Sequence, residues 1–283
     1  MITALIEALQ YDFMRNALMA GVLVSLACGI IGTFVVIKRI VFISGGIAHA
    51  AYGGIGLGYF LGFNPVLGAI VFSVAAALGM GAVQRKARQR VDTVIGVMWA
   101  IGMAVGIIFV DLAQGYKADL MSYLFGSILA VPSSDLLIML ALDVVIIALV
   151  SLFYKELLAV TFDETFATVE NVPVNTIYLV LVCMIGLTVV MLMRVVGLIM
   201  VIAMLTMPSA IAGQFVKEMR KMMALASILG MAFTTVGLWL SYFWNLTSGA
   251  TIILVSATAY MVSLGLKPLI RRQRLMSARA TVR

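Results

Sequence analysis

The chain has 283 residues, of which 64% are hydrophobic and only 11% are charged, with a formal net charge of +7 and a mean hydropathy of +1.16. Soluble domains carry about 25% charged residues, so this composition excludes an ordinary soluble globular protein. The charges are clustered and leave apolar stretches of roughly 20 residues, the length of a membrane-crossing helix. We therefore predict an all-α, polytopic membrane protein without a separate soluble domain.

Nine apolar runs follow a mostly polar N-terminal segment. Residues 1–16 carry apolar side chains at helical spacing, which predicts a segment in the membrane interface. A transmembrane domain is predicted over 17–266 and a basic cytoplasmic tail over 267–283. The runs are 17–37, 41–62, 66–84, 93–113, 133–153, 174–193, 195–216, 223–244 and 250–266. The shorter stretch 118–131 is predicted to be re-entrant or interfacial, and we expect eight to nine transmembrane helices.

The basic residues predict the orientation of these runs. If every run crosses once, all 19 Lys and Arg residues except Arg15, Lys117 and Arg194 lie on one side of the membrane. Such a bias marks the cytoplasmic side. It favours nine crossings, with the N-terminus outside and the C-terminus in the cytoplasm. The positive charge is then explained by topology and contact with membrane lipids, and no nucleic-acid partner is expected.

The second run contains the only histidine of the chain, in the stretch ISGGIAHAAYGGIGLG. Four small residues recur there at i, i+4 spacing and form a ridge almost without side chains: Gly46, Ala50, Gly54 and Gly58. Such ridges allow close helix packing in lipid. His49 lies one residue round from this ridge, so we expect it to face protein or a water-filled cavity.

His49 has two interpretations that the residue alone does not separate. An ionisable group inside a membrane is a functional candidate, and neutral imidazole suits zinc and other late transition metals. The alternative is a packing role, with a hydrogen bond to a neighbouring helix. A single histidine cannot form a tight metal site, so a metal ligand here would be transient, as is typical of a carrier rather than a metalloenzyme.

Other polar or helix-breaking residues are weaker candidates. Asp143 lies near the middle of the fifth run and could line a pathway, although a hydroxyl partner on a facing helix is the favoured interpretation. Asp111 and Asp119 lie near the predicted outer edge, where they either attract cations or are simply solvated. Pro208 interrupts the seventh run and predicts a kink, which could serve as a hinge.

The segment YKELLAVTFDETFATVENVP, residues 154–173, is the longest break between runs. Thr161 and Glu164 match a capping box and predict a helix that starts there. Phe162, Phe166 and Val169 would line one face of this helix. Such a face either rests on the lipid or docks a cytoplasmic partner. The chain contains no G-x-x-x-x-G-K-[ST] motif, so an ATPase that drives it is expected on another polypeptide.

Five stretches give a specific resemblance. They are GIAHAAYGGIGLG in the second run, DLMSYLFGSIL at 119–129, KELLAVTFDETFA at 155–167, VGLIMVIAMLTMPSAIA at 196–212 and SYFWNLTSGATIILVSA at 241–257. In this order the chain resembles the permease subunits of zinc, manganese and iron ABC importers, the ABC-3 family. The resemblance implies a type II-like ABC importer permease fold in the cytoplasmic membrane of a prokaryote, and a transport subunit rather than an enzyme.

The family also implies partners and substrate. We expect a second permease chain in a homodimer, two cytoplasmic ATPase subunits that bind ATP, and an extracytoplasmic metal-binding protein. A divalent metal ion would be the substrate, and no cofactor would be bound permanently. The segment 155–172 would be the coupling element for the ATPase, with Phe162, Asp163, Glu164, Phe166 and Ala167 as its residues.

Position 45 departs from the family pattern. Manganese and zinc members often carry an aspartate four residues before the histidine, where this chain has Gly45. The loss of this hard oxygen ligand leans weakly toward zinc. The alternatives left open are a permease for a metal chelate or a cobalamin-like substrate and an ATP-independent secondary carrier. An intramembrane enzyme is disfavoured because the chain has one histidine and no HExxH motif.

Overall fold

The computed structural model of the protein describes residues 9–86, 91–113, 124–198 and 201–281, and the regular structure of these residues is entirely helical. The long helices are α2 (Asp12–Lys38), α3 (Val41–Leu61), α4 (Pro65–Lys86), α5 (Val91–Leu112), α7 (Ser133–Leu152), α10 (Val174–Val195), α12 (Met219–Trp244) and α13 (Ser248–Thr281). The shorter ones are η1 (Ile128–Ala130), α8 (Tyr154–Phe162), α9 (Glu164–Val169) and α11 (Val201–Phe215).

Eight helices in the described part of the chain are long and apolar enough to cross a membrane. They correspond to eight of the nine apolar runs, so the prediction of an all-helical, multi-pass membrane protein is confirmed. The remaining run, 195–216, contains only the 15-residue α11. A helix of that length spans about 22 Å, less than the roughly 30 Å of a hydrocarbon core.

Close backbone contact at a glycine pair explains why α11 is short. Gly197, with φ of +80°, and Gly126, with φ of +72°, both have left-handed backbone conformations that suit glycine. A Cβ added to Gly126 would lie 2.2 Å from the Gly197 nitrogen. The chain just before η1 therefore occupies the space that a longer α11 would need. The predicted run 195–216 therefore begins with this turn, and its helix begins at Val201.

Within the described residues, the chain nevertheless passes nine times between the two ends of the bundle. The Arg220 guanidinium, at the start of α12, lies 4.7 Å from the ring centroid of Tyr154, which follows α7. The beginning of α12 and the end of α7 are therefore at the same end of the bundle. Because α10 runs away from that end, α11 carries the chain back and makes the ninth, shorter pass.

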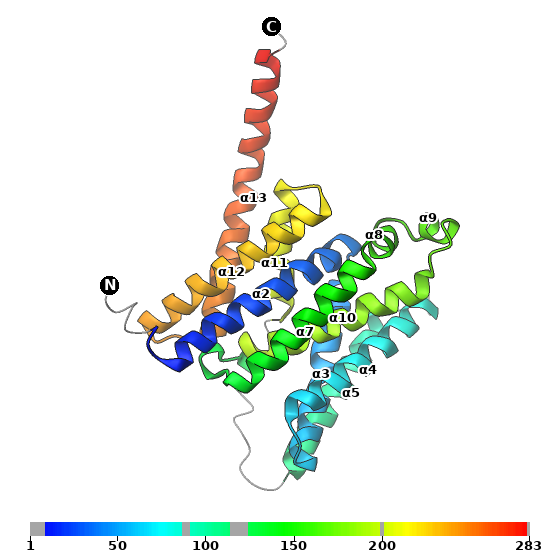
Figure 1. Cartoon of the computed structure of the whole chain (residues 1–283), viewed down its shortest axis with the longest axis vertical. Coiled ribbons are helices and arrows are strands. Elements are labelled where there is room, and N and C mark those ends of the chain that lie inside the picture. The colour runs from blue at the N-terminus through cyan, green and yellow to red at the C-terminus, as the bar shows by residue number, and fades with distance from the viewer. Residues whose placement is uncertain (1–8, 87–90, 114–123, 199–200, 282–283) are drawn as a thin grey trace.

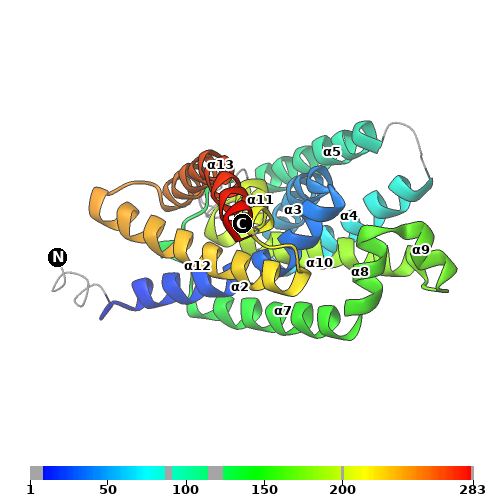
Figure 2. The same cartoon turned by 90° about the horizontal axis from the view of Figure 1, so that it is seen from above.

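The central helix of the bundle is α2, which packs against α12, α11, α10 and α7. Helices α3, α4 and α5 form a group beside it, and the short α8 and α9 lie together at one end (Figure 1). Seen from above, α5 and α13 lie along one side of the molecule and α7 lies along the opposite side (Figure 2). The core is therefore built around α2 and α10, and the α5 and α7 sides face outward.

The two terminal segments begin and end differently from the apolar runs. Helix α2 starts at Asp12, five residues before the first run, and residues 1–8 of the predicted interfacial segment lie outside the described part. Helix α13 continues beyond its apolar part, Ser248–Leu266, to Thr281, and its last turns leave the bundle (Figure 1). The basic tail is thus an extension of the last membrane helix.

Candidate functional site

The small-residue ridge of α3 lies against its two neighbouring helices. A Cβ added to Gly54 would lie 2.0 Å from the Gly68 carbonyl oxygen of α4, and one added to Gly102 of α5 would lie 2.4 Å from the Ala50 Cα. Larger residues would separate these backbones, because the space between them is already filled. Gly58 likewise faces α4 at Pro65, and Gly46 lies between Ile95 of α5 and Met80 of α4. The ridge thus holds α4 and α5 close to α3 on either side of His49.

His49 is half-buried and its neighbours come from α5. Its ring stacks on Trp99, with 3.8 Å between centroids and an interplanar angle of 19°. Its Nδ1 lies 2.9 Å from the Met103 sulfur. A nitrogen and a thioether are therefore the donor atoms that this place offers to a metal. Both contacts are between side chains without formal opposite charges, and a stacked aromatic pair is worth about 0.5–1.5 kcal/mol.

Gly45, where many family members carry an acid, is covered by hydrocarbon. A Cβ at this position would lie 2.6 Å from the Ile202 Cδ1 of α11. An aspartate here would have to displace that isoleucine before its carboxylate could reach His49. Within the described residues there is no group of three or more His, Cys, Asp or Glu side chains that could hold a metal. Metal contact at His49 therefore stays a prediction.

The acidic pathway candidates are not brought together with His49. Asp143 is buried in α7, which packs on α2 and α10, and neither carboxyl oxygen has a hydrogen-bond partner. The expected hydroxyl partner was therefore wrong, because the face of α2 opposite Asp143 offers the thiol of Cys28 instead. Asp111 is exposed at the C-terminal end of α5, and Asp119 lies outside the described residues. Their roles remain predictions.

Pro208 lies inside α11 and is buried. Proline has no N–H, so it removes one hydrogen bond from the helix ladder and frees a carbonyl one turn earlier. The preceding turn is packed tightly on α2, since a Cβ added to Gly32 would lie 2.0 Å from the Leu205 carbonyl oxygen. The weak point of α11 is therefore held against the central helix. A hinge at this position remains a prediction.

The predicted coupling segment is two short helices, α8 and α9, joined at Asp163. The cap differs from the predicted one. Asp163 Oδ1 accepts hydrogen bonds from the backbone N–H groups of Thr165 (2.8 Å) and Phe166 (3.0 Å), and so caps α9. Thr161 lies within α8 and its hydroxyl has no hydrogen-bond partner. The predicted capping box was wrong because α8 continues through Phe162, leaving the aspartate at the break.

The apolar face of this segment is exposed at its tip. Phe162, Phe166 and Val169 are 62%, 56% and 74% exposed, while Ala167 is fully buried against the bundle. Exposed aromatic side chains of this kind mark interaction surfaces. We call Phe162, Phe166 and Val169 the α9 tip. Ala167 is buried behind it, and Asp163 caps the helix that carries it.

Glu164 connects the α9 tip to two membrane helices. Lys38 Nζ, at the end of α2, donates to Glu164 Oε1 at 2.7 Å and to the Val160 carbonyl at 2.6 Å. Arg85, near the end of α4, lies 3.4 Å from Glu164 Oε2. Partial burial would raise the pKa of the Glu164 carboxyl, but the hydrogen bond and charge of Lys38, together with Arg85, outweigh it and lower the pKa. The carboxylate is therefore ionised at neutral pH.

Tyr178 of α10 completes this cluster. Its ring lies 5.5 Å from Lys38 Nζ and 5.2 Å from Arg85 Cζ, both within the range of cation–π attraction. These residues surround a cavity of about 390 Å³. We call Lys38, Arg85, Glu164 and Tyr178 the ionic cluster. The sequence analysis missed it, since Lys38 and Arg85 served only to predict orientation; their positions at the ends of two membrane helices, opposite an acidic loop, were the available signal.

Comparisons with known proteins agree with this architecture. Residues 10–267 match the family model of the ABC 3 transport family. The chain is 62% identical over 267 residues to the membrane protein slr2045 of Synechocystis sp., covering 94% of this chain and 95% of that protein. It is 36% identical over 255 residues to the manganese transport system membrane protein MntC of Listeria monocytogenes, covering 90% and 91%.

A solved structure gives the same result for the fold. PsaBC from Streptococcus pneumoniae, in complex with a Fab, matches with a TM-score of 0.87 at 32% sequence identity, covering 98% of this chain and 100% of that one. The match extends over nearly the whole permease, including the regions of α3 and α9. The chain therefore belongs to the ABC 3 transport family, and it is the membrane permease of an ABC transporter, as its motifs predicted.

Proposed function

We propose that this permease imports Mn²⁺, passing the ion from an extracytoplasmic binding protein to the cytoplasm at the expense of ATP hydrolysed by a separate subunit. The observation that carries this proposal is the similarity over about 90% of the chain to a manganese transport system membrane protein. An ABC permease works with an ATPase and a binding protein. Membership of this family therefore argues against the ATP-independent carrier.

The geometry at His49 is compatible with Mn²⁺ as the substrate. Mn²⁺ lies at the weak end of the divalent series, so one imidazole holds it only briefly, whereas Zn²⁺ is retained more strongly. Weak retention suits an ion that must leave again. The absence of an acid at Gly45 weakly favoured zinc as the substrate. We give more weight to the similarity to manganese systems. We assign His49 the role of a passing contact.

A second copy of the chain would provide the other wall of the path. The apolar windows of α5 and α13 are only 17% and 28% buried within one chain, against 78% for α3. These two helices lie on one side of the molecule (Figure 2), the side on which His49 contacts α5. We call this surface the α5/α13 face. A homodimer across it would bring two His49 side chains to one path and present two α9 tips, one for each ATPase.

The orientation follows from charge. We propose that the end bearing α8, α9, Lys38 and Arg85 is cytoplasmic, because basic residues gather there. The α9 tip then faces the ATPase, and the α5 end near Asp111 faces the binding protein. The ionic cluster fixes α9 to α2 and α4. A movement imposed by the ATPase on the tip is thereby passed to two helices that border α3.

A metal chelate is the second candidate substrate. A metal-chelate type ABC transporter in an inward-facing conformation matches with a TM-score of 0.70, but at 13% identity it shares the fold alone. The helices around His49 are packed through glycine contacts, and the histidine is covered by Trp99. This tight packing favours a bare ion over a bulky chelate.

The test is metal-dependent ATP hydrolysis and uptake by the complete importer in proteoliposomes. Permease, ATPase and binding protein are combined, and Mn²⁺, Zn²⁺ and Fe²⁺ are compared at equal free concentration. We expect the largest stimulation and uptake with Mn²⁺, and no uptake without the ATPase. Uptake by the permease alone would overturn the proposal. Stimulation only by a chelated metal would replace the ion with the chelate.

A further inference from the structure

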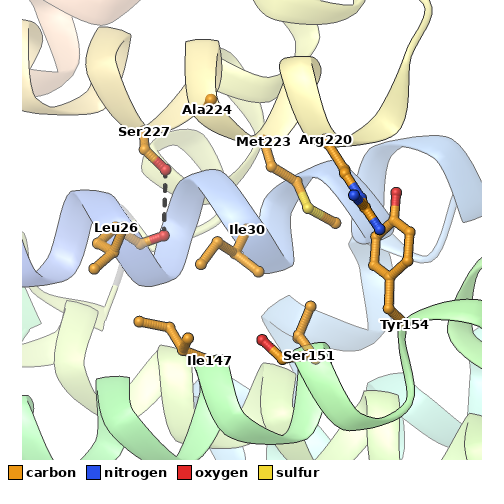
Figure 3. Close-up of a pocket in the computed structure, with 10 residues that line it drawn as sticks. Leu26, Ile30, Ile147, Ser151, Tyr154, Arg220, Met223, Ala224 and Ser227 are labelled. Atoms are coloured by element: carbon orange, nitrogen blue, oxygen red, sulfur yellow. Dashed lines mark hydrogen bonds between the residues drawn. The ribbon is translucent and has the colours of Figure 1, made fainter.

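A groove on the α7 side of the bundle is not used by the transport path. It is a cavity of about 440 Å³ between α7 and α12, with α2 as its floor (Figure 3). Leu26 and Ile30 of α2, Ile147 of α7, and Met223 and Ala224 of α12 make most of it apolar. Helix α7, which lines it, lies on the side of the molecule opposite α5 and α13 (Figure 2). A second copy seated on the α5/α13 face leaves the groove exposed to lipid.

The groove extends over about two-thirds of the depth of one lipid leaflet. Along α12 it extends from Arg220 to Ser227, seven residues that correspond to about 10 Å of helix. Half of a hydrocarbon core is about 15 Å thick. The Ser227 hydroxyl at the deep end donates to the Leu26 carbonyl at 3.5 Å, so the polar group there is turned toward the protein (Figure 3). The deep part therefore presents hydrocarbon to an acyl chain.

The opposite end of the groove is polar and positively charged. Arg220 lies over the ring of Tyr154, and the exposed Ser151 is directly below them on α7 (Figure 3). None of the described residues that line this groove carries a carboxylate. The nearby Glu218 forms an ion pair with Lys221 at 2.6 Å, which offsets its charge. A guanidinium presents a planar fork of donors that matches a phosphate, and stacking on tyrosine keeps the fork in one place.

A second groove beside α2 supplies the contrast. It lies nearer the other membrane surface, has a volume of about 650 Å³, and is lined by leucine, methionine and valine side chains of α2 and α7, with Ser133 as the polar residue. In the part of the chain that the structure describes, no charged side chain lines it. Hydrocarbon alone would fill this outer groove without selecting a head group. Of these two grooves, only the one between α7 and α12 combines an apolar lining with a cation, Arg220. We call it the inner groove.

We propose that the inner groove is a binding site for an anionic phospholipid of the cytoplasmic leaflet. One acyl chain lies along Leu26, Ile30 and Ile147, and the phosphate lies between Arg220 and Ser151. This inference rests on the orientation given under the proposed function. The lipid ties the start of α12 to the end of α7, both at the membrane surface where the ATPase docks.

Native mass spectrometry of the full-length permease with its ATPase tests this site, without metal or nucleotide. The probes are dioleoyl phosphatidylglycerol and dioleoyl phosphatidylcholine, added in equal amounts. We expect the wild-type complex to retain phosphatidylglycerol about fivefold better than phosphatidylcholine. This ratio corresponds to the attraction of about 1 kcal/mol between one basic residue and an anionic lipid surface. Arg220→Gln should abolish the preference. Lys217→Gln, an equal charge change at an exposed residue outside the groove, should leave it intact.

Two tryptophan substitutions distinguish lipid bound in the groove from lipid bound elsewhere on the protein surface. Ala224→Trp fills the groove and should reduce retention of both lipids, whereas Ile228→Trp, at a residue 62% exposed on the same helix, should not. Equal retention of the two lipids by the wild type, or an unchanged preference in Arg220→Gln, would overturn the proposal. So would cross-linking of Ala224→Cys to a second permease copy. Because no metal is present, a failed transport assay leaves this result unaffected.

Discussion

His49 and Glu164 are each contacted by two side chains from other parts of the chain, but the contacts are of different kinds. The imidazole has an indole and a thioether beside it, at 3.8 Å and 2.9 Å. The carboxylate has an ammonium and a guanidinium, at 2.7 Å and 3.4 Å. The membrane residue is thus held by an aromatic stack and a sulfur contact, and the surface residue is held by charge from two helices.

This difference matches two different tasks. A group that an ion passes must release it, so weak and replaceable contacts are suitable there. A helix that transmits force from an ATPase must not move independently of the bundle, so charged and directional contacts are suitable there. The four predictions below test whether changes near His49 affect only ion passage and changes near Glu164 and the α9 tip affect only stability or ATPase binding.

The largest effect is expected at the α9 tip. Phe166→Asp places a charge where an aromatic side chain, 56% exposed in the permease alone, would enter the ATPase surface. Loss of an aromatic anchor costs about 2 kcal/mol or more, roughly 30-fold in Kd. The measurement is the affinity of the purified permease for its ATPase.

The control for this change is Trp244→Asp, which removes an exposed aromatic residue at the end of α12, away from α9. It should leave the affinity unchanged. Co-purification of Phe166→Asp with the ATPase at normal yield would remove the docking role of the tip.

His49→Ala is expected to have the next largest effect, and on transport alone. Removing the one imidazole of the chain should lower Mn²⁺ uptake about tenfold, by analogy with the loss of groups that orient metal ligands. Assembly with the ATPase should be normal, because His49 lies in α3 and the α9 tip is untouched. Unchanged uptake would show that the histidine only fixes packing on Trp99.

The sequence predicted most of the scaffold because membrane helices are specified locally. An apolar run of about 20 residues must form its own hydrogen bonds in lipid, so its helix follows from the run itself. The run 195–216 shows the limit of this rule. Helix α11 is shortened by contact between Gly197 and Gly126, two residues 71 positions apart, and no local pattern reveals such a contact.

The candidate sites divide in the same way. Exposure of Phe162 and Phe166 could be predicted, because their spacing and flanking charges are local. The neighbours of His49 and Glu164 could not, since Met103 is 54 residues from the histidine and Lys38 is 126 residues from the glutamate. The prediction of the α9 cap was wrong for another reason. Both Thr161 and Asp163 are good capping residues, and the extent of α8 decided between them.

Glu164→Gln tests the charged half of the comparison. It leaves Lys38, whose side chain is 10% exposed, without its counter-ion. Because the glutamate itself is 43% exposed, we expect a loss of only about 1 kcal/mol in stability, measured as a lowered Tm of the detergent-solubilised permease. Glu170→Gln, an exposed change at the end of the same helix, should have no effect.

The pH dependence of this effect has a definite sign. The pKa of Glu164 is lower in the folded chain than its ordinary value, so the folded state binds the proton less well than the unfolded state. Its stabilisation is therefore complete above the ordinary glutamate pKa of about 4.3 and is lost as the pH falls below it. The difference in Tm between wild type and Glu164→Gln should be constant near neutrality and shrink in acid. A difference that grows in acid would contradict the ion pairs.

Met103→Leu is expected to have the smallest effect and addresses the metal directly. The change conserves volume, so the packing of α5 on α3 should remain, while the sulfur beside His49 Nδ1 is lost. A thioether is a soft ligand and Mn²⁺ is a hard ion, so Mn²⁺ uptake should fall less than about threefold. A loss of Mn²⁺ uptake as large as that of His49→Ala would mean that the thioether belongs to the path as fully as the imidazole does. His49 and Met103 would then form a pair of metal ligands, and their contact would not be a packing contact alone.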